Sequence, residues 1–455
     1  MDVRTIRVRF AGEGSGEAPL TWSQADHWRA ISAAGRAATF GGAFEMPAET
    51  TVSGAVELLR YLVGRHQALR TRLAFDADGE PRQVCVEAGE IELLVVGPDT
   101  DPDELYRRLA DQPFDYRQDW PIRLAVVADG ERVRHLVVVY LHLAVDGGGI
   151  EALLADLAAR DPGTGAAAGP VTAVQPLALA RRQAEPAAQR QSSAAMRYLE
   201  RVLRSAPAEL LGEPGPGPAD YRAIRYTSPA AALAVPVAAT ALGVPPASVL
   251  SAAVAVGLAR RLGTGTVWAM MLVSNRFRPG LTDSVGLIVQ SSPFLLDLGG
   301  ISLAEAAARA RTSLLLCYKN AYYDGRHRDA LLARLTAELG RDPVRDCCYV
   351  NDRRRDRPVG PDAADRLPDV LHAGRWQLED RPAADLPALP LMVNVEDVPG
   401  DQPALALPIS FDTRYLSIDD ALALARGIET AAVELAVSPQ VPTGVGTYLP
   451  AGQPA

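Results

Sequence analysis

One stretch of the chain, Leu136 to Leu157, restricts the possible fold more than any other. Its first part, Leu136 to Leu143, is a nearly continuous apolar run, which predicts a strand buried on both faces. Apolar residues then recur at helical spacing: Ile150, Leu153, Leu154 and Leu157. The stretch therefore predicts a buried strand, a short turn and a helix.

Polar residues stand in this turn, where packing alone gives little reason for them. They are His142, Asp146 and the glycine run Gly147 to Gly149. A lone histidine in an apolar setting is more often a satisfied core group than a catalyst. Here, Asp146 can form a charge pair that fixes the conformation of the turn. The glycines have no side chain, so backbone or substrate can approach them closely. This combination favours a functional site, with His142 as its chemical group.

Composition limits the classes of function. The chain has 455 residues, 48% of them hydrophobic, which is enough for two or three domains with sizeable cores. Its net charge of −9 argues against bulk binding to nucleic acid or to an anionic membrane.

The four cysteines show neither disulfide nor zinc spacing, so we expect no metal. No signal peptide and no apolar run of roughly 18 residues is visible, which favours the cytosol.

A composition change divides the chain. Residues 161–186 are rich in Pro, Gly and Ala and have little periodicity, as in a crossing between lobes. We place the boundary near residue 172, which gives lobes 1–172 and 173–455.

Local signals predict several further elements. An amphipathic helix carries Trp22, Trp28 and Ile31. A solvated helix face is the simplest interpretation for Gln24 and His27, and it is the favoured one for His27. A second helix begins near residue 51, and a hairpin turns at residues 78–79. The later signals are an apolar helix that starts at residue 246 and ends at 263, a final helix capped at 417, and a basic loop, 353–355.

Short motifs along the chain then occur in a familiar order. They are PLTWSQADHW, RHQALRTRL, LHLAVDG, SNR, SVGLIVQSSPF, RDPVRD and ISFDTRYLS. In this order and spacing the chain resembles the condensation domains of nonribosomal peptide synthetases, within the superfamily of chloramphenicol acetyltransferase-like enzymes. The match extends over nearly the whole chain, and its most specific part is the pair RHxxLRT and HxxxDG.

The resemblance implies an α/β fold of two acetyltransferase-like lobes. Their mixed sheets would be flanked by helices, and the lobes would form a V around a central tunnel. His142 would lie in the tunnel, orient the acceptor and help to manage its proton. Asp146 would form a salt bridge with Arg70, and Gly147 would keep the tunnel open. Further tunnel candidates are Gly148, Tyr140, Asn275, Gln290 and Ser291.

One position departs from the family pattern HHxxxDG. Leu141 stands in place of the first histidine. Because side chains alternate across a strand, Leu141 should point with Val139 to the packing face, away from His142 and Tyr140. The change should therefore be tolerable for catalysis. Gln290 and Ser291 replace the family's Asn and Thr.

The predicted function is that of a stand-alone condensation enzyme of natural-product biosynthesis. It would join an acyl or aminoacyl group to an amine. The thioester would arrive on the phosphopantetheine arm of a carrier protein in trans, or on coenzyme A, with no bound cofactor. Two alternatives stay open: an ester-forming acyltransferase, and a non-catalytic domain that binds carrier proteins and recruits a tailoring enzyme. We expect a monomer.

Overall fold

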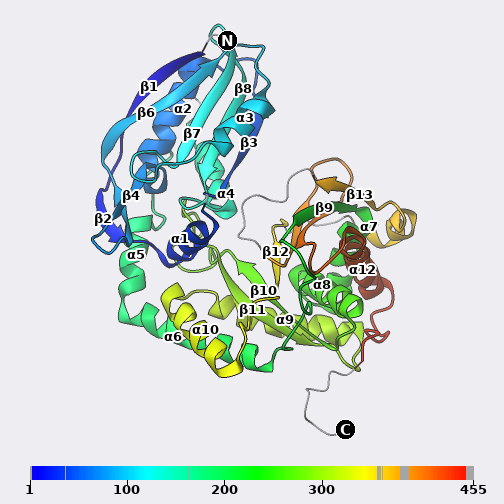
Figure 1. The fold of residues 1–455 in the computed structure, drawn as a ribbon. Coiled ribbons are helices and arrows are strands. Elements are labelled where there is room, and N and C mark those ends of the chain that lie inside the picture. The colour runs from blue at the N-terminus through cyan, green and yellow to red at the C-terminus, as the bar shows by residue number, and fades with distance from the viewer. Residues whose placement is uncertain are drawn as a thin grey trace. The chain divides into compact units, whose positions relative to one another are not determined.

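The chain forms two compact units, seen in a computed structural model that describes residues 3–35, 37–161, 163–355, 360, 362–379 and 389–446. Unit 1 comprises Met1–Arg190 and Ser274–Gln290, and unit 2 comprises Gln191–Val273 and Ser291–Ala455. The segment 274–290 thus belongs to unit 1 although the chain on both sides of it belongs to unit 2. The helices and strands of both units are labelled in Figure 1.

A mixed five-stranded sheet forms the centre of unit 1. Its strands in spatial order are β1 (Val3–Ala11), β6 (Ala88–Val96), β7 (Ile122–Asp129), β8 (Arg132–Leu141) and β3 (Thr39–Glu45). β6 and β7 are parallel, and the other neighbours are antiparallel. A separate antiparallel sheet contains β2 (Gly16–Pro19), β5 (Pro81–Cys85) and β4 (Thr71–Phe75). β8 is buried from Val137 to Leu141, as its apolar sequence predicts.

Helices cover both faces of the five-stranded sheet, because successive side chains of a strand point to opposite faces. On the face that carries Val138 and Tyr140 lie α2 (Val52–Arg65) and α4 (Gly147–Ala158). On the opposite face lie α1 (Trp22–Ala34) and α3 (Pro102–Asp111). The short helix η1 (Gln67–Arg70) and α5 (Pro176–Ala184) complete this unit. Leu154 of α4 was expected in the apolar face but is exposed, because α4 buries only one narrow side.

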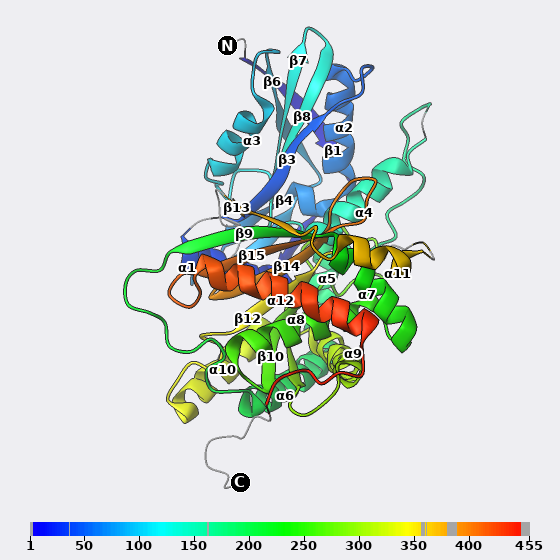
Figure 2. The ribbon, with the colours of Figure 1, turned by 90° about the vertical axis from the view of Figure 1, so that its right-hand side faces the viewer.

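Unit 2 contains a seven-stranded mixed sheet. Its strands in spatial order are β11 (Gln290–Asp297), β10 (Thr266–Val273), β12 (Cys348–Asp352), β14 (Leu391–Asp397), β15 (Leu405–Asp412), β9 (Tyr221–Ser228) and β13 (Arg375–Glu379). Its helices are α7 (Pro229–Leu242), α8 (Pro246–Leu262), α9 (Leu303–Asn320), α10 (Gly325–Leu339), α11 (Ala363–Arg366), η2 (Leu367–Val370) and α12 (Ile418–Val437). Figure 2 shows α7, α8 and α12 close together, and their apolar residues join one large core.

The predicted α/β class, with mixed sheets flanked by helices, is confirmed. The V-shaped arrangement and the tunnel stay predictions. The first unit extends to Arg190 instead of ending near residue 172, because α5 packs on β2 and η1 of that unit. The helix α6 (Pro186–Ser205) crosses this division.

Several predicted element ends are confirmed. The apolar helix α8 starts at Pro246 and is followed by Gly263 in a left-handed conformation. Ser417 and Asp420 form a capping box at the start of α12. The hairpin between β4 and β5 turns through Gly79, whose φ of 81° suits glycine.

Among the described residues, no single helix is both long and apolar enough to cross a membrane. The pair α7 and α8, bent by 114°, meets the length and composition criteria only when the two are joined.

The close approach of α8 and α12 yields a test of core packing. A Cβ on Gly257 would lie 2.9 Å from Cγ1 and 3.0 Å from the backbone nitrogen of Ile428, whereas one on Gly427 would meet nothing nearer than 3.7 Å. We expect Gly257→Ala to lower the free energy of unfolding by about 1–3 kcal/mol. Gly427→Ala should be neutral or stabilise by up to about 1 kcal/mol through helix propensity. Urea unfolding measures both, and equal effects would contradict this packing.

Candidate functional site

His142 follows directly on the last residue of β8. Its backbone nitrogen donates to the carbonyl of Ala38, 2.9 Å away, which holds the end of the strand in place. Leu141 packs with Val139 and Leu143, whereas Tyr140 packs with Val138 on the opposite face. The predicted alternation of Leu141 and Tyr140 is therefore confirmed, and Leu141, in place of the first motif histidine, packs in an apolar cluster beside Val139.

The contact of His142 with Val145 assigns the tautomer of its neutral ring. Its Nδ1 lies 3.0 Å from the carbonyl oxygen of Val145. A carbonyl oxygen can only accept, so Nδ1 carries the hydrogen and Nε2 keeps its lone pair. This arrangement makes Nε2 the atom that can take a proton from a substrate.

Two aromatic rings contact His142. The ring centroid of His27, on α1, is 4.6 Å away, and that of Phe40, on β3, is 5.2 Å away. Burial, and secondarily the charge of His142, lowers the pKa of His27 to about 3, so His27 is neutral near pH 7. The predicted solvated position of His27 is wrong, because α1 turns this residue toward His142.

Asp146 connects α4 to the segment 274–290. It caps α4, because its Oδ1 accepts from the backbone nitrogen of Gly149 at 2.8 Å. The same oxygen lies 2.7 Å from Nη2 of Arg276. Its Oδ2 accepts from the backbone nitrogens of Ile288, at 2.8 Å, and Val289, at 3.0 Å. This carboxylate is buried, and each of its oxygens has at least two partners.

The predicted salt bridge between Asp146 and Arg70 is wrong. Arg70 is fully buried, and its guanidinium donates to the carbonyls of Glu13, Gly14 and Val86. It thereby ties η1 to the chain around β2 and β5. The partner of Asp146 is Arg276, from the motif SNR, a residue that the sequence analysis did not single out.

The three glycines of the turn have different surroundings. A Cβ on Gly149 would lie 2.6 Å from Cγ2 of Val145 and 2.8 Å from the carbonyl oxygen of Gly286. One on Gly148 would lie 2.8 Å from Nη1 of Arg276. One on Gly147 would meet no atom within 4 Å. Close approach of backbone therefore requires glycine at 149, a Cβ at 148 would displace the guanidinium of Arg276, and the role of Gly147 in keeping space open stays a prediction.

The remaining tunnel candidates take part in structural contacts. Asn275 is buried with a φ of 58°, and its Nδ2 donates to the carbonyl of Ile288 at 3.3 Å. Gln290 is buried, and its Nε2 donates to Asp26 on α1 at 2.9 Å. Ser291 belongs to unit 2, where its carbonyl accepts from the hydroxyl of Tyr323 at 2.8 Å. Lining of a tunnel by these residues stays a prediction.

Two further observations bear on ligands. The described residues include no group of three or more His, Cys, Asp or Glu that could hold a metal ion. The basic loop 353–355 is partly neutralised within unit 2. Arg354 is only 8% exposed and pairs with Asp352, and Arg353 pairs with Glu396.

Comparison with known proteins identifies the family. The model of the condensation domain matches residues 42–326, more than half of the chain. The chain therefore belongs to the condensation-domain family, as the motifs predict.

Its curated relatives are much longer proteins. An isonitrile lipopeptide synthase of Mycobacterium tuberculosis is 31% identical over 288 residues, which cover 57% of this chain and 11% of that protein. The probable nonribosomal peptide synthetase CymA of Salinispora arenicola is 33% identical over 148 residues, 31% of this chain and 2% of that protein. The chain thus spans a small fraction of the length of these relatives.

Solved structures share the fold over nearly the full length. The X-domain from teicoplanin biosynthesis, also solved in complex with OxyB, has a TM-score of 0.69 and 21% identity, and the match covers 97% of this chain and 99% of that chain. The condensation domain of the Monacolin K polyketide synthase MokA has a TM-score of 0.72 and 17% identity, with 95% and 100% covered. The condensation domain for chain release from the enacyloxin polyketide synthase has a TM-score of 0.68 and 19% identity, with 94% and 84% covered.

The contacts of Asp146 yield a stability test. Asp146→Ala leaves the Arg276 guanidinium without its carboxylate and three backbone N–H groups without an acceptor. We expect it to lower the free energy of unfolding by about 3–5 kcal/mol. Asp129→Ala, at an exposed pair with Arg134, should cost at most about 1 kcal/mol. Denaturant unfolding compares the two, and similar losses would contradict the central position of Asp146.

The lowered pKa of His27 yields a pH test. Below pH 6.5 the unfolded chain gains a proton at His27 that the folded chain binds only near pH 3, so stability is lost as the pH falls through this window. We expect His27→Phe to reduce the slope of unfolding free energy between pH 6 and 4 by about 1.4 kcal/mol per pH unit. His372→Phe, at an exposed position, is the control. An unchanged slope in His27→Phe would show that His27 is not buried as a neutral group.

Proposed function

We propose that this chain transfers an acyl or aminoacyl group from a phosphopantetheine thioester to an amine. The amine nitrogen attacks the thioester carbonyl carbon, a carbon–nitrogen bond forms and the carbon–sulfur bond breaks. The proton lost by the nitrogen passes to Nε2 of His142 and then to the departing sulfur. Atoms and charge balance without an oxidant, a reductant or a metal.

The observation that carries this proposal is the contact between Nδ1 of His142 and the carbonyl oxygen of Val145, which assigns the ring hydrogen to Nδ1. With its hydrogen on Nδ1 facing Val145, Nε2 has a lone pair for the proton of the acceptor. General-base help of this kind contributes roughly 10²- to 10⁴-fold to the rate, and alignment of two bound reactants supplies on the order of 7–11 kcal/mol. Positioning of donor and acceptor therefore contributes more than the proton transfer itself.

The surroundings of His142 also suit a group that becomes positively charged during the reaction. His142 carries a positive charge while it holds the proton of the acceptor. A second cation at 4.6 Å would oppose this charge, but burial keeps His27 neutral near pH 7. Phe40 contacts the ring of His142 at 5.2 Å without adding charge.

The donor in this proposal is the phosphopantetheine arm of a carrier protein, or coenzyme A. Carrier proteins are commonly acidic, and in this proposal the basic loop 353–355 is a candidate docking patch for one. Arg353 and Arg354 pair with Glu396 and Asp352, so a carrier would compete with these carboxylates for the two guanidinium groups.

Removal of the His142 ring tests the proposal. Transfer is measured by mass spectrometry with acyl-carrier and acyl-coenzyme A donors against amine and alcohol acceptors. We expect amide product with the wild-type chain and a loss of about 10²- to 10⁴-fold in His142→Ala. His372→Ala, at an exposed histidine, is the matched control and should keep full activity.

Each alternative has its own outcome in this assay. Product with the alcohol acceptor alone would replace amide formation by ester formation. Full turnover in His142→Ala would remove the histidine from the mechanism. Tight binding of a loaded carrier without turnover by any donor would replace catalysis by recruitment.

A further inference from the structure

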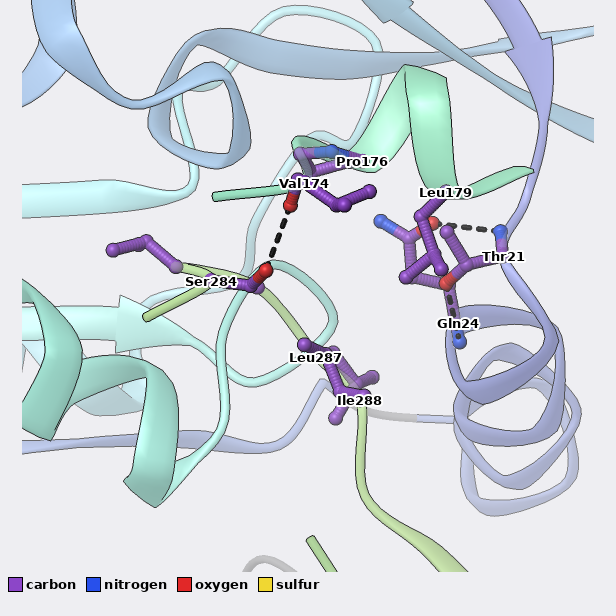
Figure 3. A pocket seen from close by; sticks show the side chains of 10 residues that line it. Thr21, Gln24, Val174, Pro176, Leu179, Ser284, Leu287 and Ile288 are labelled. Atoms are coloured by element: carbon purple, nitrogen blue, oxygen red, sulfur yellow. Dashed lines mark hydrogen bonds between the residues drawn. The ribbon is translucent and has the colours of Figure 1, made fainter. Parts of the chain in front are cut away.

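The packing of helix α1 holds His27 beside His142. The helix begins at a capping box, in which the backbone nitrogen of Thr21 donates to Oε1 of Gln24 at 2.9 Å and that of Gln24 donates to Oγ1 of Thr21 at 3.3 Å. Figure 3 shows this first turn, with the small pocket that Thr21 and Gln24 help to line. Trp28 packs in the apolar cluster at the end of β8. Because α1 is fixed at its start and along this side, the ring of His27 lies in contact with that of His142.

Neither ring nitrogen of His27 has a hydrogen-bond partner among the described residues. Nε2 is sealed inside the protein, whereas Nδ1 is not. A neutral imidazole carries one hydrogen, and a sealed N–H group without an acceptor is rarer in proteins than an unpaired acceptor. The hydrogen of His27 therefore belongs on Nδ1, and Nε2 keeps its lone pair. His27 thus presents a single N–H donor, on the nitrogen that a substrate can reach.

A histidine at this position is costly for the fold. Burial of a polar ring without a hydrogen-bond partner is unfavourable, and burial also lowers the pKa of His27 to about 3. A phenylalanine ring of similar shape would carry neither cost. Local costs of this kind occur mainly where function requires them. Packing alone therefore does not account for His27.

The two contacting rings present complementary groups. Nε2 of His142 accepts, Nδ1 of His27 donates, and the ring centroids are 4.6 Å apart. In the tetrahedral intermediate of the proposed reaction, the amine nitrogen and the former carbonyl oxygen are bonded to the same carbon atom. The protein groups that bind them must therefore also be neighbours. Because His27 is neutral near pH 7, it can donate to this oxygen without opposing the positive charge that develops on His142.

We propose that His27 is a second catalytic residue, whose Nδ1–H donates to the carbonyl oxygen of the acyl group as this oxygen becomes negatively charged. The inference rests on the proposed function, because that reaction supplies the carbonyl. The electron pair of the carbon–oxygen double bond moves to the oxygen as the carbon–nitrogen bond forms, and it returns as the carbon–sulfur bond breaks. The hydrogen of His27 stays on Nδ1 throughout.

Three substitutions of His27 separate its donor from its bulk. The amide nitrogen of asparagine is as many bonds from Cβ as Nδ1 of histidine, and that of glutamine as many as Nε2. His27→Asn therefore keeps a donor at the accessible position, His27→Gln moves it to the sealed position, and His27→Phe has none. His372→Asn, at an exposed histidine, is the matched control.

Transfer is measured by mass spectrometry for each variant. We expect a loss of about 10²- to 10³-fold in His27→Gln and His27→Phe, the usual effect of removing one donor to an oxyanion, and less than about tenfold in His27→Asn. A role in filling space would give the opposite order, because asparagine is the smallest of the three and leaves a cavity. Full transfer in His27→Phe, or transfer in His27→Gln that equals or exceeds that in His27→Asn, would overturn the inference.

The tautomer of His27 is measured without turnover, by ¹⁵N NMR of the histidine rings. The signals that disappear in His27→Asn identify His27 in the wild-type spectrum. We expect the hydrogen on Nδ1 and the lone pair on Nε2 near pH 7. A hydrogen on Nε2 would overturn the inference whatever the rates are.

The two measurements distinguish this inference from the proposed function. Transfer that depends on His142 and is unaffected by the three substitutions of His27 removes only the role of His27. Absence of transfer by the wild-type chain removes the proposed function and the oxyanion with it. The NMR result then still decides whether His27 presents an N–H donor beside His142.

Discussion

The carboxylate of Asp146 is the interaction on which the candidate site depends. It caps α4, neutralises Arg276 and accepts from two consecutive backbone N–H groups of the segment 274–290. Loss of any one of these partners would leave a buried charge poorly compensated, which is strongly destabilising. One side chain thereby fixes both the turn that presents His142 and the segment 274–290.

Much of the fold could be predicted because it depends on local signals. The buried strand β8, the end of α8 at Gly263 and the cap of α12 all follow from periodicity and capping residues within a few positions of one another. The extent of unit 1 could not be predicted in this way. It depends on contacts of α5 and of the segment 274–290, which are distant in sequence from the residues they pack against.

In the candidate site, too, the residues marked by local signals could be predicted, and those that depend on distant contacts could not. His142 and Asp146 could be found because polar residues interrupt an apolar strand-to-helix turn. The partner of Asp146 could not, since Arg70 and Arg276 are both arginines in short motifs and only the folded chain distinguishes them. His27 was missed because its position on an amphipathic helix does not reveal which ring it meets on another element.

Because the segment 274–290 belongs to unit 1, this unit cannot be produced as one continuous fragment of the chain. A fragment that ends at Arg190 contains His142 and Asp146 but lacks Arg276 and the N–H groups of Ile288 and Val289. Its buried carboxylate would be left uncompensated, so the first unit is not a transplantable module. Recombination between relatives near residue 190 would combine Asp146 from one parent with Arg276 and the segment 274–290 from the other. These residues must come from the same parent for their contacts to form.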